Sequence, residues 1–139
     1  MARYVARVPL RWTDQDSFHH VNHARAVTLL EEARIGLLFD EASAAGVTGF
    51  AAGVVVAGLE VDYRRQIPYR SHALRVCMWV HQVRAASFLI DYELHDGPDE
   101  SDAVAVGART RMALFDLAAQ RPRRITAEER AFLDRWGEA

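Results

Sequence analysis

The sequence predicts an α+β domain in which an antiparallel sheet wraps around one long helix. Apolar residues recur at helical spacing over about residues 22–45, and four later segments alternate between apolar and polar side chains. Because only one long helix is available to cover the sheet, we expect the sheet to wrap around it. Such a sheet leaves open edges, which favour pairing with a second copy of the chain.

The first elements are a short strand and the long helix. Residues 3–10 alternate loosely and predict the strand. The apolar stripe of the helix is formed by Ala26, Leu30, Ala33 and Leu37, and Gly46 is expected to end the helix because glycine is favoured just after a helix terminus.

Four strands and a short helix are expected to follow. In the segment 55–64, one face is expected to carry Val55, Ala57, Leu59, Val61 and Tyr63. Further alternating segments predict strands at 74–81, 86–94 and 104–114, so the sheet has five strands. Thr126 and Glu129 have the spacing of a capping box, which predicts a short C-terminal helix.

Length and composition restrict the possible classes of protein. The 139 residues predict a single domain over 1–139. A formal charge of −2 without a long basic run argues against nucleic-acid binding, and all seventeen cationic residues are arginine. The one cysteine, Cys77, excludes an intrachain disulfide and is expected in the sheet core. The absence of a membrane-length apolar stretch or a signal-peptide core predicts a cytoplasmic protein that does not bind membranes.

The segment WTDQDSFHHVNH, residues 12–23, is the densest in titratable side chains. Asp14 and Asp16 precede the helix, where acidic residues can cap free N–H groups, so their position alone fits capping as well as function. His19 and His23 are four residues apart, but no HExxH-type motif is present and such ligands would cross the helix boundary. We therefore expect no metal and no other cofactor. No nucleophile elbow surrounds Ser17, which argues against a serine triad.

A carboxylate beside a helix N-terminus remains, and this arrangement suits acyl transfer. Free backbone N–H groups and the helix dipole can polarise a carbonyl and stabilise the oxyanion that develops on it. A nearby aspartate can attack that carbonyl or activate a water molecule.

The stretch RWTDQDSFHHVNHARAVTLLEEAR resembles the motif of the 4-hydroxybenzoyl-CoA thioesterase family of hotdog-fold proteins. The later LEVDYRRQIPYRSHALRV is similar to the strand, turn and strand of the same family. The resemblance implies the hotdog fold, a five-stranded antiparallel sheet around a central helix. It also implies dimers that often form tetramers, with active sites at the dimer interface.

The resemblance also implies roles for single residues. Asp16 matches the catalytic carboxylate, and His23 matches the position whose backbone N–H polarises the thioester carbonyl. His20 and Asn22 match residues that shape the turn. Asp14 is expected to be a structural or electrostatic companion that contributes to substrate binding.

Three positions depart from the family pattern. Small residues, often glycine, are common where this chain has His19, asparagine or an aromatic residue is common at His23, and tyrosine is common at Ala26. A backbone N–H donor survives any side chain except proline, so the mechanism is retained. His19 either hydrogen-bonds Asp16 or protonates the leaving thiolate, and the simpler alternative is a solvent-facing loop histidine.

The expected activity is hydrolysis of an acyl-CoA thioester by a homodimer or homotetramer. Tyr63, Arg64 and Arg65 are expected to bind substrate, because arginine clusters bind phosphates such as those of coenzyme A. The alternative for the arginines is an ordinary solvated strand edge. Two alternatives to the activity remain: hydrolysis of thioesters carried by acyl carrier protein, and a hotdog module that binds acyl ligands or assembles without turnover.

Overall fold

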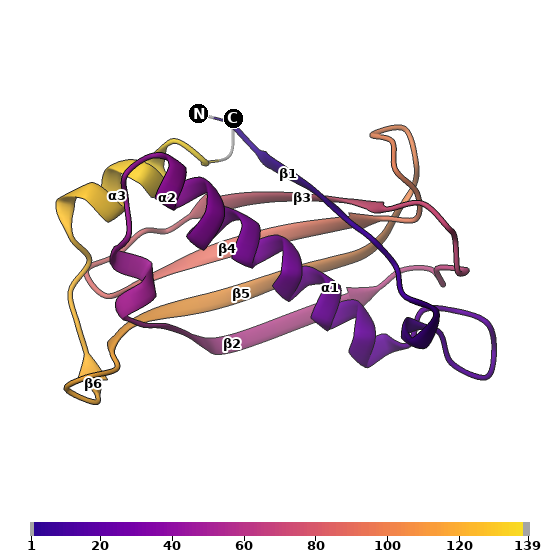
Figure 1. Ribbon diagram of the computed structural model, residues 1–139, viewed down its shortest axis with the longest axis horizontal. Coiled ribbons are helices and arrows are strands. Elements are labelled where there is room, and N and C mark those ends of the chain that lie inside the picture. The colour runs from indigo at the N-terminus through magenta and orange to yellow at the C-terminus, as the bar shows by residue number, and fades with distance from the viewer. Residues whose placement is uncertain (1, 138–139) are drawn as a thin grey trace.

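The computed structural model describes residues 2–137, in which a curved antiparallel sheet packs against one long helix (Figure 1). The strands are β1 (Tyr4–Val8), β2 (Val54–Tyr63), β3 (Leu74–His81), β4 (Ser87–His95) and β5 (Val104–Asp116). They are ordered β1-β3-β4-β5-β2, and the two-residue β6 (Arg121–Pro122) pairs with the end of β5. The expected α+β architecture, with five main strands and a central helix, is confirmed.

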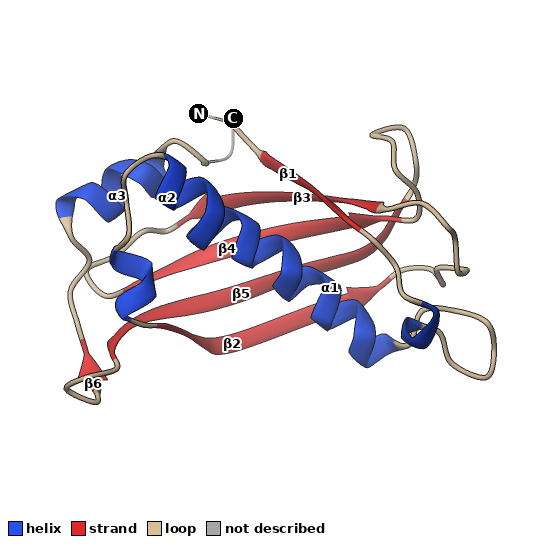
Figure 2. Cartoon of the chain, viewed as in Figure 1, coloured by secondary structure: helices blue, strands red, loops and turns tan. Residues whose placement is uncertain are grey.

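The central helix lies across the inner face of the sheet (Figure 2). It begins as α1 (His23–Ile35), continues through a π-helical segment at Gly36–Glu41 and ends as α2 (Ala42–Ala44). The expected stripe is buried, since its residues are at most 3% exposed: Ala26, Leu30, Ala33 and Leu37. Gly46 follows the helix with a φ of +81°, a left-handed conformation that glycine adopts without a steric penalty.

Three short helices complete the fold: η1 (Trp12–Asp14), η3 (Gly49–Ala52) and α3 (Ala127–Asp134). The predicted capping box of α3 is present, because the Thr126 hydroxyl accepts from the Glu129 N–H and the Glu129 carboxylate accepts from the Thr126 N–H. Phe132 and Leu133 of α3 join the core between helix and sheet. Within residues 2–137, no helix is long and apolar enough to cross a membrane.

Strand β2 is an edge of the sheet, and its face pattern differs from the prediction. The register shifts between Val56 and Gly58, so a β-bulge interrupts the alternation. Val56 pairs with the buried Met112, whereas Val55 pairs with Ala113 on the other face; the expected position of Val55 was therefore wrong. Leu59 and Tyr63 do share the helix-side face, yet they are 45% and 47% exposed because no strand covers this edge.

Candidate active site

The loop before α1 folds into a tight turn around Asp16. The Asp16 N–H donates to the His20 carbonyl at 2.9 Å, and the His19 N–H donates to the Asp16 carbonyl at 3.0 Å. The backbone of His19 has a φ of +64°. Residues other than glycine, asparagine and aspartate adopt this left-handed conformation at an energetic cost. The conformation gives a physical reason for the glycine that the family often has at this position.

Asp14 lies under this loop and is only 1% exposed. Its carboxylate accepts from the Arg11 N–H at 2.8 Å and from the Arg11 guanidinium at 3.1 Å. Its carbonyl accepts from the Asn22 N–H at 2.8 Å. Asp14 therefore ties the two ends of the loop together from below.

Asn22 is the N-cap of α1. Its side-chain oxygen accepts from the Ala24 N–H at 2.9 Å, which is the usual bond of an asparagine cap. The helix begins at His23, whose N–H is one of the first-turn donors that have no partner inside a helix. Among residues 2–137, the structure gives this N–H no hydrogen-bond acceptor.

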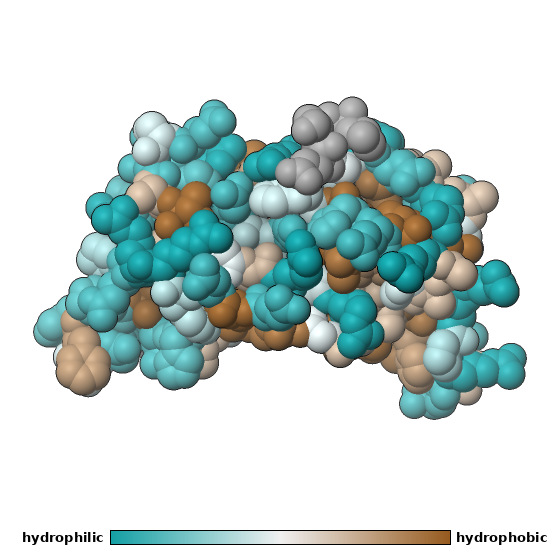
Figure 3. Space-filling model, turned by 180° about the vertical axis from the view of Figure 1, so that it is seen from behind, coloured by the Kyte–Doolittle hydropathy of each residue, from teal (hydrophilic) through white to brown (hydrophobic). Residues whose placement is uncertain are grey.

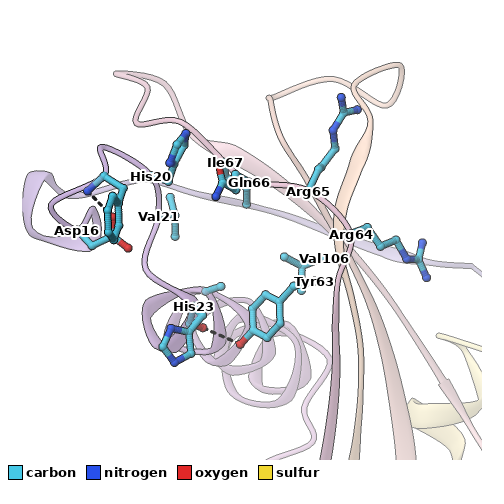
Figure 4. A pocket seen from close by; sticks show the side chains of 12 residues that line it. Asp16, His20, Val21, His23, Tyr63, Arg64, Arg65, Gln66, Ile67 and Val106 are labelled. Atoms are coloured by element: carbon cyan, nitrogen blue, oxygen red, sulfur yellow. Dashed lines mark hydrogen bonds between the residues drawn. The ribbon is translucent and has the colours of Figure 1, made fainter.

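A cavity of about 400 Å³ lies between the loop, the first turn of α1 and the segment after β2 (Figure 4). Asp16, His20 and His23 line it from one side, and Tyr63, Arg64 and Arg65 from the other. Its apolar part is formed by side chains from four separate segments: Phe18, Val21, Ala26, Ile67 and Val106. The cavity thus joins a carboxylate, a helix N-terminus and an apolar surface.

The Asp16 carboxylate is only partly engaged. Its Oδ1 accepts from the Phe18 N–H at 2.9 Å, and its other oxygen has no protein hydrogen-bond donor within the described chain. The side chain is half-buried at the edge of the cavity. A carboxylate in this state has free lone pairs for a water molecule or a substrate.

Tyr63 connects the end of β2 to the first turn of α1. Its hydroxyl donates to the His23 carbonyl at 2.8 Å, and its ring meets the His23 imidazole edge to face at a centroid distance of 6.2 Å (Figure 4). This bond fixes the position of the helix start relative to the sheet edge.

The two arginines at the cavity extend outward from it (Figure 4). Arg64 contacts Asp62 at 3.0 Å, and Arg65 lies 4.0 Å from Asp96. Both side chains are more than half exposed, so these ion pairs are screened by solvent and contribute little stability. Within residues 2–137, no group of three or more His, Cys, Asp and Glu side chains is arranged to hold a metal ion.

The structure brings six of the nine predicted site residues to one cavity: Asp16, His20, His23, Tyr63, Arg64 and Arg65. Asp14 and Asn22 hold the loop and the helix start, and His19 projects into solvent.

The sequence analysis did not identify the apolar residues that line the cavity, nor Gln66, which also lines it. One bond explains why Val21 and Ile67 meet there, since the Val21 N–H donates to the Ile67 carbonyl at 2.7 Å. No local sequence pattern signals this contact between residues 46 positions apart.

Several solved structures of similar fold are named as thioesterases, some of them as predicted or probable ones. A predicted thioesterase from Bacillus stearothermophilus is 21% identical, with a TM-score of 0.80 over 99% of this chain and 98% of that chain. The probable thioesterase YbaW from Escherichia coli is 23% identical, with a TM-score of 0.74 over 99% and 100%. A thioesterase from Thermus thermophilus, complexed with coenzyme A and Zn, is 22% identical, with a TM-score of 0.72 over 95% and 92%.

At these identities the structural likeness establishes a shared fold, and it confirms the expected hotdog architecture. A search of curated protein sequences found no match. The family is established by the sequence itself, because the model of the thioesterase-like superfamily matches residues 10–133, from the start of the active-site loop into the last helix. The chain therefore belongs to the thioesterase-like superfamily.

Proposed function

We propose that this protein hydrolyses an acyl-CoA thioester to a free acid and coenzyme A. One observation carries the proposal: the Asp16 carboxylate and the start of α1 at His23 line the same cavity. A reacting carbonyl in that cavity would meet both a nucleophile or base, at Asp16, and backbone donors, at the start of α1.

The helix start is the proposed oxyanion site. The free N–H of His23 and the positive end of the helix dipole stabilise negative charge on the carbonyl oxygen. An oxyanion donor of this kind contributes about 3–4 kcal/mol to transition-state stabilisation. The Asn22 cap and the Tyr63 hydroxyl hold this turn before substrate arrives, so little reorganisation is needed during the reaction.

Asp16 carries the covalent chemistry in one of two ways. As a general base, it takes a proton from water, the hydroxide attacks the carbonyl carbon, and the C–S bond breaks to release the thiolate. As a nucleophile, it attacks the carbonyl carbon itself, the C–S bond breaks to release the thiolate, and water then cleaves the resulting anhydride. Oxygen-18 from labelled water enters the enzyme during a single turnover only in the second case.

The two ends of the substrate have distinct surroundings in this proposal. The acyl group lies against the apolar wall around Ala26 and Val106, and the phosphates lie toward Arg64 and Arg65. The structural relative from Thermus thermophilus binds coenzyme A, which supports this ligand class.

A second copy of the chain is expected along β2. This strand is an edge, and three of its apolar side chains are exposed by 39% or more: Val55, Val56 and Leu59. A long apolar edge is normally covered, and a symmetric dimer covers it with the same strand of the partner. Tyr63 ends β2 and lines the cavity, so the partner would lie beside the active site. A tetramer would then form from two such dimers.

The test is an assay of the purified protein against short, long and aromatic acyl-CoAs, with a thiol reagent to detect released coenzyme A. Asp16→Ala and Asp16→Asn are assayed in parallel, and His19→Ala, in the same turn, is the matched control. We expect wild-type turnover, loss of turnover in both Asp16 variants and retained turnover in the control. Equal turnover by Asp16→Ala would exclude the mechanism while leaving the class of enzyme intact.

Two other functions give different outcomes. A non-catalytic acyl-binding module shows saturable binding of acyl-CoA without release of thiol across the whole panel. A thioesterase for acyl carrier protein hydrolyses acyl groups on that carrier much faster than the same groups on coenzyme A. The Asp16 carboxylate lies beside the cavity with one oxygen that accepts no hydrogen bond from the described chain. This observation favours an enzyme over a module that only binds.

A further inference from the structure

A second cavity lies on the outer face of the sheet, away from the central helix. It has a volume of about 580 Å³ and is bounded by the middle of β2, the middle of β5 and the start of β4. Arg109 and Arg111 face outward because they alternate along β5 with the buried Thr110 and Met112. Figure 3 shows this side of the molecule, where hydrophilic side chains surround smaller hydrophobic patches. We call this cavity the outer groove.

Arg111 is held in place across β2. Its Nη2 donates to the Ala57 carbonyl at 3.0 Å, at the bulge of the edge strand. Gly58 leaves room for this crossing, since a Cβ atom there would lie 3.3 Å from the same nitrogen. A guanidinium has five N–H donors, so most of those of Arg111 remain available.

Arg84 approaches the outer groove from the connection between β3 and β4. Its backbone is fixed at both ends, because its N–H donates to the Ser87 carbonyl at 2.8 Å and its carbonyl accepts from Arg130 at 3.1 Å. Its guanidinium has no hydrogen-bond or ion-pair partner among the residues that the structure describes. The unpaired guanidinium of Arg84 is therefore attached to a backbone segment that hydrogen bonds hold in place.

The charges of the outer groove are unevenly compensated. Arg109 forms two hydrogen bonds with Asp91, at 2.7 and 3.0 Å, and pairs across the sheet with Glu60. Acidic side chains thus neutralise Arg109, whereas Arg84 and Arg111 have no carboxylate partner within the described chain. Two uncompensated positive charges match one phosphate monoester, which carries about −1.5 to −2 at neutral pH.

Part of the remaining lining is apolar. The half-buried Leu89 lies beside Arg111 on the neighbouring strand and faces outward with it. Guanidinium groups bind phosphate through paired N–H donors, and the Leu89 side chain favours a nonpolar group attached to that phosphate. We propose that the outer groove binds a phosphate monoester with an apolar body, at a site separate from the acyl cavity.

The proposed dimer leaves this groove open. Pairing along β2 extends the sheet within its own plane, so a second copy lies beside the outer face rather than on it. The proposal is therefore independent of the proposed hydrolysis and of the β2 dimer.

Calorimetric titration with phenyl phosphate, inorganic phosphate and benzyl alcohol tests the proposal. We expect saturable binding of phenyl phosphate, weaker binding of inorganic phosphate and none of benzyl alcohol. Arg84→Ala and Arg111→Ala should each weaken phenyl phosphate binding about tenfold or more, because each removes charge-assisted hydrogen bonds. Arg124→Ala removes an exposed arginine that lines neither cavity, so it is the matched control and should bind as wild type does. Arg64→Ala tests whether the ligand enters the acyl cavity instead.

Arg84→Ala removes no side-chain hydrogen bond or ion pair among the described residues, so its melting temperature without ligand should be close to that of wild type and exclude misfolding as the cause. No saturable binding up to about 10 mM, enough to fill most of a site of ~1 mM affinity, would overturn the proposal. Weakening by Arg64→Ala instead of Arg84→Ala would place the ligand in the acyl cavity and also overturn it. A changed association state of Arg84→Glu without phosphate binding would assign the groove to a second copy of the chain.

Discussion

Asp16 lies in the loop before α1 and Glu129 lies in α3, and these two parts of the chain are near opposite ends of the molecule (Figure 1). The surroundings of the two carboxylates differ in kind. Glu129 is 1% exposed, and both of its oxygens accept from Arg123 at 2.8 Å, while one also accepts from the Thr126 N–H. Asp16 is half-buried and accepts one bond from the Phe18 N–H. A saturated carboxylate stabilises the fold, whereas one with free lone pairs beside a cavity is available for chemistry.

The same contrast separates two neighbours in the active-site loop. Asp14 is as buried as Glu129 and is likewise bonded to an arginine, while Asp16, two residues later, is open to the cavity. Position in the sequence therefore does not distinguish the structural role of Asp14 from the proposed chemical role of Asp16. The number of hydrogen bonds that each carboxylate accepts does distinguish them. The following predictions test whether this distinction holds.

The largest expected effect is on activity at Asp16. Asp16→Asn should lower kcat about 10²–10⁴-fold, the range for a lost general base, because the amide cannot accept a proton. Its free energy of unfolding should change by less than about 1 kcal/mol, since the lost charge is half-exposed and locally bonded. Steady-state kinetics and urea unfolding of the same preparation measure both. A large loss of stability with intact kcat would reverse the roles assigned to Asp16 and Glu129.

Glu129→Gln should show the opposite pattern. Removing one charge of a buried ion pair costs about 3–5 kcal/mol of unfolding free energy, because Arg123 is left uncompensated. Activity per folded molecule should stay near that of wild type. Urea unfolding gives the first quantity, and the assay at a temperature where the variant is folded gives the second.

The pH dependence of stability sharpens this result. Burial by itself raises the pKa of Glu129, but hydrogen bonds from Arg123 and Thr126 outweigh it and hold the pKa below its ordinary value of 4.5. The contribution of Glu129 is therefore present above about pH 4.5 and is lost as the pH falls through the lowered pKa. Wild type should lose stability more steeply than Glu129→Gln on acidification, measured by unfolding at several pH values. Asp91, whose pKa is also lowered, titrates in both proteins and cancels in the difference.

Tyr63→Phe should have an intermediate effect. The ring that lines the cavity stays, but the hydrogen bond to the His23 carbonyl is lost. We expect stability to fall by about 0.5–1.5 kcal/mol and kcat to fall more than KM changes, because the helix start is less well positioned. A change confined to KM would assign Tyr63 to substrate binding alone.

The smallest effect is expected at His19. His19→Gly relieves a positive φ but adds freedom to the unfolded chain, so these terms offset each other to within about 1 kcal/mol. Turnover should be unchanged for a loop histidine in solvent. A loss of kcat in both His19→Gly and His19→Ala would instead give the imidazole a role in catalysis.

Local patterns predicted most of the fold, including the loop before α1. The spacing of Ala26, Leu30, Ala33 and Leu37 identified the buried helix face, and Thr126 with Glu129 identified the start of α3. These predictions succeeded because helix periodicity and capping depend on residues within one or two turns. The bulge at Ala57 was missed because it arises from pairing between β2 and β5.

The sequence by itself determined the order of the main strands and helices and a carboxylate-bearing loop before the long helix. Only the tertiary structure decided that Asp14 is saturated while Asp16 faces a cavity, and that Val21 meets Ile67 in its wall. It also decided that Arg109 is neutralised by Asp91, whereas Arg84 and Arg111 have no carboxylate partner within residues 2–137. The reason is physical: propensity and capping act between near neighbours, but burial and charge compensation depend on segments that only folding brings together.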